Sequence, residues 1–153
     1  PQSLEQNRSI VKLTLNRNQF KLFPDVIFSL TNLQILNLAL NQIETIPETF
    51  CEMNKSVKLL ALQHNQIHFL PNNIGMMENL ILLDVTQNHI ISVPSTIPAC
   101  QKLRALFLSG NPLPSFPRDL LHLSKLQQLR LSSTQLSGVP PQLGLLTCLE
   151  ELL

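Results

Sequence analysis

The sequence is poor in charged residues and in glycine, and it has no long apolar run. Charged side chains make up 14% of the 153 residues and the formal net charge is +1, so no strong electric field attracts nucleic acid or acidic lipid. Four glycines are too few for a glycine-rich phosphate loop. No stretch reaches the roughly 18 apolar residues of a membrane-spanning helix, and the first ten residues lack the apolar core of a signal peptide. We therefore predict no nucleic-acid partner and no membrane insertion.

Cysteine is also scarce. Cys51, Cys100 and Cys148 are far apart and odd in number, which argues against a disulfide framework and indicates a reducing compartment. Two glycosylation-type triplets, at Asn7 and Asn54, point instead to secretion. Such triplets are common by chance, so we expect the protein to be cytoplasmic.

One fixed period runs through the chain. Asparagine recurs every 23 or 24 residues, threonine takes the sixth place, and a proline follows each of the six after six residues. The two series are Asn18, Asn41, Asn65, Asn88, Asn111 and Thr134, and Pro24, Pro47, Pro71, Pro94, Pro117 and Pro140. Apolar positions keep the same period, in the pattern LxxLxLxxNxL. The single extra residue lies in CEMNKSVKLL, so the insertion falls in a connecting segment and leaves the strand pattern intact.

This pattern resembles the leucine-rich repeat family over nearly the whole chain. The 23-residue period and the LP-like pair after each strand unit are most similar to the intracellular subclass found in Ras-pathway scaffolds. The resemblance implies an α/β leucine-rich repeat solenoid that is curved and binds proteins. It places a parallel sheet on the concave side and short helices or 3₁₀ turns on the convex side.

The residues explain the repeat. Alternate strand side chains point to opposite faces, so Leu60 and Leu62 face inward while Ala61 and Gln63 face outward. Each asparagine amide can donate to and accept from turn groups that are otherwise buried unpaired, so we expect a structural ladder. Thr134 has one hydroxyl for this task and should serve it less completely. The prolines should bring the preceding residues into the core: Phe23, Ile46, Leu70, Val93, Phe116 and Val139.

Residues 1–153 form a single array of six full repeats with partial units at both ends. Leu4 takes the place of a convex apolar residue of a preceding repeat, and CLEELL opens a seventh strand unit. Because the end repeats of a solenoid normally need polar caps, we expect a segment of a longer protein.

Candidates for chemistry are few. We expect solvated surface histidines at His64, His68, His89 and His122 and no metal site, because no cysteine has ligand spacing to them. His64 and Asp84 are about 10 Å of strand apart, too far for a catalytic pair. Cys100 takes a buried apolar position. Gly75 and Gly144 share one repeat position, which indicates a role in local backbone geometry. We predict neither enzymatic activity nor a cofactor.

The outward strand positions distinguish the repeats, because the core positions only repeat. Six places before each asparagine the residues are apolar through the four central repeats, and four places before it they end in an aromatic and a charge. We predict protein contact at Ile35, Leu59, Ala61, Leu82, Asp84, Arg104, Phe107 and Arg130. The alternative is that apolar residues there only suit a strand partly covered by its neighbours.

The favoured hypothesis is an intracellular signalling scaffold or regulator whose concave sheet binds another protein. That partner is a small GTPase, a phosphatase or a neighbouring domain of the same chain. The rival is a recruitment or autoregulatory segment of a multidomain kinase, GTPase or ubiquitin ligase. A weaker alternative is an extracellular receptor array.

Overall fold

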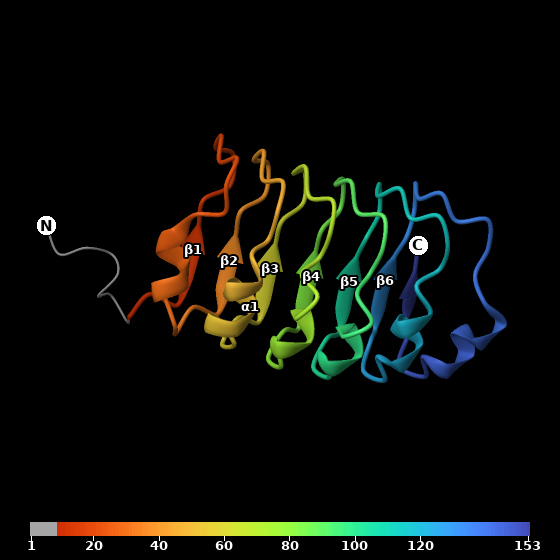
Figure 1. Ribbon diagram of the computed structural model, residues 1–153. Helices are drawn as coiled ribbons and strands as arrows, with labels where there is room; N and C mark the ends of the chain where they lie inside the picture. The colour runs from red at the N-terminus through yellow and green to blue at the C-terminus, as the bar shows by residue number, and fades with distance from the viewer. Residues whose placement is uncertain (1–8) are drawn as a thin grey trace, which may run out of the picture.

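The computed structural model describes residues 9–153, and in them seven short strands form one parallel sheet in chain order (Figure 1). One three-residue or two-residue strand comes from each repeat, and the repeats stack side by side along the solenoid. The predicted α/β leucine-rich repeat solenoid is confirmed. The strands are β1 (Lys12–Thr14), β2 (Ile35–Asn37), β3 (Leu59–Ala61), β4 (Leu82–Asp84), β5 (Ala105–Phe107), β6 (Gln128–Arg130) and β7 (Glu151–Leu152).

The sheet keeps one register throughout. Leu36 pairs with Leu60 although the extra residue lies between them, so the insertion is absorbed outside the strands as predicted. The central residue of each strand faces the core, and in β2 to β6 it is fully buried. Residues at the same repeat position therefore lie in rows across the sheet, and the outward rows form a face of their own, here called the concave face.

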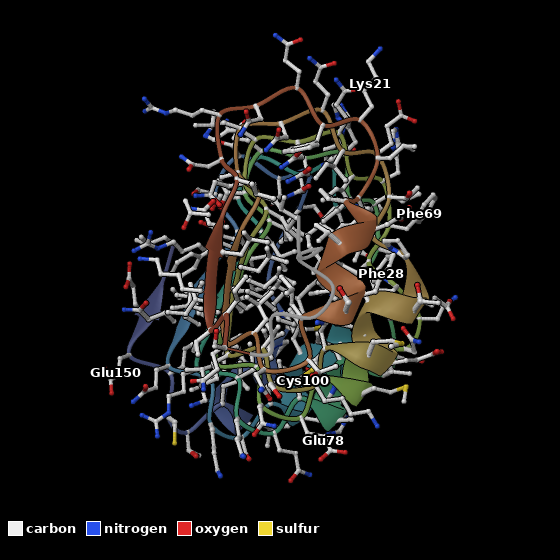
Figure 2. All side chains as sticks on the ribbon, turned by 90° about the vertical axis from the view of Figure 1, so that its left-hand side faces the viewer. Lys21, Phe28, Phe69, Glu78, Cys100 and Glu150 are labelled. Atoms are coloured by element: carbon white, nitrogen blue, oxygen red, sulfur yellow. The ribbon has the colours of Figure 1, made fainter. Side chains whose placement is uncertain are left out.

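Short helices cover the other side of the core (Figures 1 and 2). In five repeats the helix is of 3₁₀ type and in one it is α-helical, in agreement with the prediction. The carbonyl oxygen of the proline six residues after each asparagine position accepts a bond from the N–H three residues later, as in Ile74 N to Pro71 O at 3.0 Å. This turn begins the helix in four repeats and directly precedes it in η3 and η4. The helices are η2 (Asp25–Ser29), α1 (Glu48–Met53), η3 (Ile74–Met76), η4 (Ile97–Ala99), η5 (Arg118–His122) and η6 (Pro141–Leu145).

Helix α1 accommodates the extra residue. Its last turn closes by a bond from Asn54 N to Phe50 O, four residues back, whereas Met77 N in the next repeat bonds Ile74 O, three residues back. A hydrogen bond that spans one more residue widens the coil from 3₁₀ to α geometry. The insertion therefore changes the helix type and leaves the next strand in place.

The core holds one layer of apolar side chains per repeat. Phe23, Ile46, Leu70, Val93 and Phe116, the residues before five of the prolines, are buried as predicted. Phe23 also packs against Phe50 of the next repeat, with ring centroids 4.8 Å apart and ring planes tilted by 50°. The prediction is wrong for Val139, which is 52% exposed, because within residues 9–153 no complete repeat covers its turn.

The residue before each asparagine position adopts a left-handed backbone conformation. Its φ lies between 55° and 57° at Arg17, Leu40, His64, Gln87 and Ser133, and is 68° at Gly110. A single residue in this conformation turns the chain sharply out of the strand. The turn costs some strain in five of the repeats, because only Gly110 adopts it freely.

The two glycosylation-type triplets differ in what the structure shows of them. Asn54 is fully buried, and its Nδ2 donates to Ile27 O at 3.0 Å and to Leu30 O at 3.1 Å. A glycan therefore cannot be attached there without opening the fold. Asn7 lies outside the described residues, as does Leu4. None of the helices in residues 9–153 has the length and apolar character that a membrane crossing requires.

The last repeat should open more easily than the central ones. Val139, Leu145 and Leu153 are more than half exposed, so few neighbouring contacts hold residues 139–153. In hydrogen exchange we expect the strongest amide protection from Leu60 to Leu83 and the weakest after Leu143. Protection that stays uniform to the last strand would contradict this expectation.

Candidate protein-binding surface

Four buried asparagines join neighbouring repeats at the ends of the strands. Asn88 Nδ2 donates to Val85 O of its own repeat and to Leu62 O of the preceding one, both at 3.0 Å. Its Oδ1 accepts from Ile67 N at 3.0 Å, also in the preceding repeat. The same set of bonds is made by Asn41, Asn65 and Asn111. These bonds hold the concave face to the core.

The two outer members of the series bond differently. Asn18 is exposed, and its Nδ2 donates only within its own repeat, to Leu15 O and Asn16 O. Thr134 donates its hydroxyl to Leu131 O at 2.8 Å. Leu113 N, at the position that elsewhere bonds the next asparagine, donates instead to Asn111 O at 2.8 Å. The side chain of Thr134 therefore does not link the fifth and sixth repeats in the way that Asn88 links its neighbours.

The residues predicted to contact a partner lie on or beside the concave face. Strand pairing places Ile35, Leu59 and Leu82 in one row. Leu59 is 36% exposed and the other two are half-buried, so this row presents apolar surface to solvent. Ala105, which continues the row, is only 7% exposed and ends the apolar strip. The second row comprises Ala61, Asp84, Phe107 and Arg130, and Arg104 is exposed beside Ala105.

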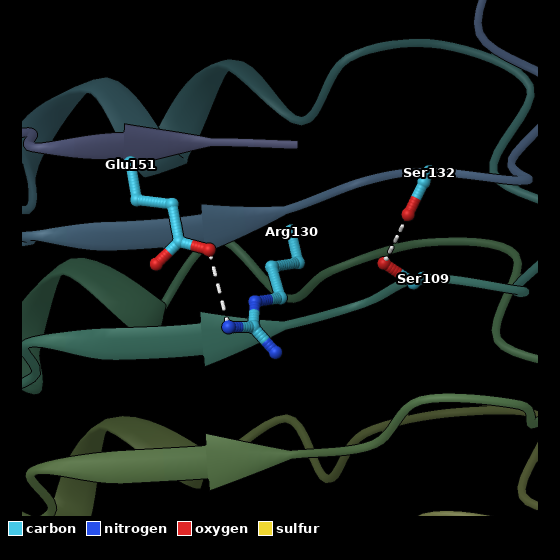
Figure 3. Close-up of polar contacts among 4 residues, drawn as sticks. All are labelled: Ser109, Arg130, Ser132 and Glu151. Atoms are coloured by element: carbon cyan, nitrogen blue, oxygen red, sulfur yellow. Dashed lines mark hydrogen bonds and ion pairs between the residues drawn. The ribbon is translucent and has the colours of Figure 1, made fainter.

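Phe107 and Arg130 form one unit. The guanidinium carbon of Arg130 lies 4.3 Å from the ring centroid of Phe107, and Arg130 Nη2 lies 3.1 Å from Glu151 Oε1 (Figure 3). The sequence suggested an open aromatic ring and a separate charge, but the cation covers one face of the ring. Stacking of this kind contributes about 0.5 to 1 kcal/mol at exposed sites. Their shared repeat position in adjacent repeats placed the two residues side by side, but it did not predict the stack.

Polar groups line the far end of the concave face. Asp84 Oδ1 accepts from Thr86 N at 3.0 Å, and Asn37 Oδ1 accepts from Ala39 N at the same distance. The hydroxyls of Ser109 and Ser132 lie 3.0 Å apart (Figure 3). Asp84 is thus held against the C-terminal end of its own strand.

The buried thiols are poor nucleophiles. Burial raises the pKa of Cys100 to about 12, and its Sγ donates to Ile74 O at 3.3 Å. Burial is also the main cause that raises the pKa of Cys51 to about 12, with smaller contributions from nearby negative charge at Cys100, Glu48 and Glu52. Both thiols stay protonated at neutral pH, so they pack as small apolar groups. All three cysteines are free.

The histidines lie on the surface, as the sequence predicted. The rings of His68 and His89, from adjacent repeats, have centroids 5.2 Å apart, whereas the sequence gave no reason to pair them. All four histidines are exposed. In residues 9–153 no three histidine, cysteine or acidic side chains gather closely enough to hold a metal ion.

Three solved structures share this architecture. A leucine-rich repeat protein of Leptospira interrogans is 34% identical with a TM-score of 0.91, and the match covers 97% of this chain and 39% of that one. The ectodomain of a plant membrane receptor kinase from Arabidopsis thaliana, solved in complex with Casparian strip integrity factor 2, is 28% identical with a TM-score of 0.86 over 97% of this chain and 18% of that one. An internalin from Listeria monocytogenes shares the fold at 21% identity, with a TM-score of 0.82 over 97% of this chain and 42% of that one.

The chain therefore spans less than half the length of these structures. Among curated proteins, no sequence matches it significantly. The family model for the leucine-rich repeat matches residues 8–67 and 78–136, which is more than half of the chain. Domains of this family generally mediate protein–protein interaction and are typically not enzymes. The chain belongs to the leucine-rich repeat family.

Proposed function

We propose that the concave face binds a partner protein and that the parent protein is an intracellular signalling scaffold or regulator. The observation that supports this best is the partly exposed apolar row of Ile35, Leu59 and Leu82, bordered by the stacked pair of Phe107 and Arg130. Apolar and aromatic side chains at the centre of an interface, with charges around them, are the usual arrangement of a protein-binding surface. A small GTPase, a phosphatase and a domain of the same chain remain the partner classes that we propose.

Two observations favour the cytoplasm over an extracellular site for this chain. The three cysteines are unpaired, and Cys51 and Cys100 are buried in separate repeats, as suits a reducing compartment. Asn54 of one glycosylation-type triplet is buried and bonded. A receptor ectodomain such as the Arabidopsis neighbour represents the alternative, and a recruitment segment of a multidomain enzyme is the other.

The proposal predicts that Phe107→Ala weakens binding of a partner captured from cytosol by about 1 to 3 kcal/mol. The lost ring is part of the binding surface, while its loss costs the fold only the stack on Arg130, about 0.5 to 1 kcal/mol. Arg130→Glu should weaken binding chiefly at low salt, where screening is least. Calorimetry measures both affinities, and circular dichroism checks the fold.

Two convex variants serve as controls, because Glu48→Lys in α1 and Asp119→Lys in η5 change charge on the helical side. Both should bind like the parent protein. If the convex changes abolish binding and the concave changes do not, the partner uses the outer face and the proposal is wrong.

A further inference from the structure

A patch with basic ends lies beside the apolar row, at the N-terminal ends of the central strands. The residues just before β3, β4 and β5 are Lys58, Ile81 and Arg104, which the strand register places in one row. All three are exposed, Ile81 by 38%. The next row adds Leu59 and Leu82. These five residues, here called the edge patch, have apolar side chains in the middle and a cation at each end.

The two cations have no acidic partner within the described part of the chain. The one salt bridge found in residues 9–153 joins Arg130 to Glu151. Glu150 shares the row of Arg104 but lies two strands further on, and it accepts a bond from Gln127 Nε2 at 3.2 Å. Lys58 and Arg104 are therefore available to anions from outside.

Asp84 limits how an acidic partner can approach. It lies two residues along β4 from Leu82, about 7 Å, and on the side away from Lys58 and Arg104. Its carboxylate is held there by Thr86 N. Negative charge on a partner is thus attracted at the N-terminal ends of the strands and repelled by Asp84 at the C-terminal end of β4.

The spacing of the cations sets the length of the complementary segment. Adjacent strands lie about 4.8 Å apart, so Lys58 and Arg104 are separated by about 10 Å at the backbone. In a peptide with polyproline II geometry, residues three apart in the sequence lie on the same side of the backbone and about 9 Å apart. Two carboxylates with two apolar residues between them match both the distance and the order of the chemistry across the edge patch.

From this complementarity we infer that the edge patch binds an acidic segment of a partner protein in which two apolar residues stand between two Asp or Glu residues. The inference rests on the proposed function, since it assigns the partner's chemistry to part of the same concave surface. The apolar pair covers Leu59, Ile81 and Leu82, and the carboxylates pair with Lys58 and Arg104. Burial of the apolar pair supplies affinity, and the charges select the partner.

The test is selection from a random dodecapeptide phage library on the immobilised protein, followed by fluorescence anisotropy with the enriched peptides in 150 mM salt. We expect enriched peptides to carry acidic residues on both sides of an apolar pair. Lys58→Glu combined with Arg104→Glu should weaken their binding at least about tenfold, because two attractive contacts become repulsive. Lys21→Glu combined with Arg118→Glu makes the same change in net charge away from the edge patch and should leave binding unchanged.

Each other outcome overturns the inference and is distinguishable from failure of the proposed function. If the enriched peptides have no acidic bias and Leu82→Ser abolishes their binding, the concave site is supported and its acidic partner is refuted. Peptides insensitive both to Leu82→Ser and to the Lys58 and Arg104 changes refute the concave site as well. The inference also fails if no peptide is enriched over a selection without protein. It fails too if a single-stranded oligothymidine binds as tightly as the peptides and with the same dependence on Lys58 and Arg104, because the patch then attracts polyanions in general.

Discussion

Replacing Asn88 with alanine is expected to lower the free energy of unfolding by about 1 to 3 kcal/mol. The side chain lies in the middle of the array and is only 4% exposed. Its loss leaves Ile67 N without its acceptor, while Leu62 O and Val85 O lose one of two donors and keep those from Asn65 and Asn111. A buried backbone N–H without a partner pays its full desolvation cost.

The same repeat position supplies two matched controls. Asn18→Ala removes bonds that an exposed side chain makes within one repeat, so its cost should be much smaller. Thr134→Asn should be neutral or stabilising, since the new amide can accept from Leu113 N and link the last two repeats. Urea melts of the three variants measure these differences. Equal midpoints for Asn88→Ala and the parent protein would show that the asparagine bonds add nothing to stability.

The repeated part of the fold was predictable because its signals are local and recur. The strand row of Leu36, Leu60 and Leu83 follows from alternation, and the asparagine period carries the register across the extra residue. Proline likewise predicted where four of the six helices begin, whereas η3 and η4 begin three residues after it. Val139 was mispredicted for the opposite reason. Its burial depends on a neighbouring repeat, and the residues of its own repeat do not predict whether that neighbour covers it.

Features that depend on specific side-chain contacts were not predictable. The residue with left-handed backbone before the asparagine is Arg17, Leu40 or His64 in some repeats and Gly110 in another. A glycine therefore indicated this conformation in only one repeat. The stack of Arg130 on Phe107 depends on the rotamers of two side chains. Three residues of the edge patch, Leu59, Leu82 and Arg104, were predicted from the sequence as contact residues, while Lys58 and Ile81 were assigned to no row.

Gly75 and Gly144 illustrate how identical repeat positions acquire different roles. The sequence assigned both to local backbone geometry, but neither has the positive φ that glycine alone adopts freely. A Cβ at Gly75 would lie 2.5 Å from Thr96 O and 2.9 Å from Ala99 Cβ, in the next repeat. At Gly144 a Cβ meets nothing within 4 Å. Gly75 is therefore needed for the close approach of η3 to the segment around η4.

Gly75→Ala is accordingly expected to destabilise the fold by about 1 to 3 kcal/mol, the usual cost of overpacking a filled site. The nearest atom is a backbone oxygen that already accepts from Ala99 N at 3.0 Å, so it cannot swing aside as the end of a flexible side chain would. Gly144→Ala should instead be neutral or stabilise by up to about 1 kcal/mol, because alanine loses less backbone entropy on folding. Thermal melts of the two variants compare the same substitution at the same repeat position. If both shift the melting temperature equally, contact between η3 and η4 does not account for the glycine at position 75.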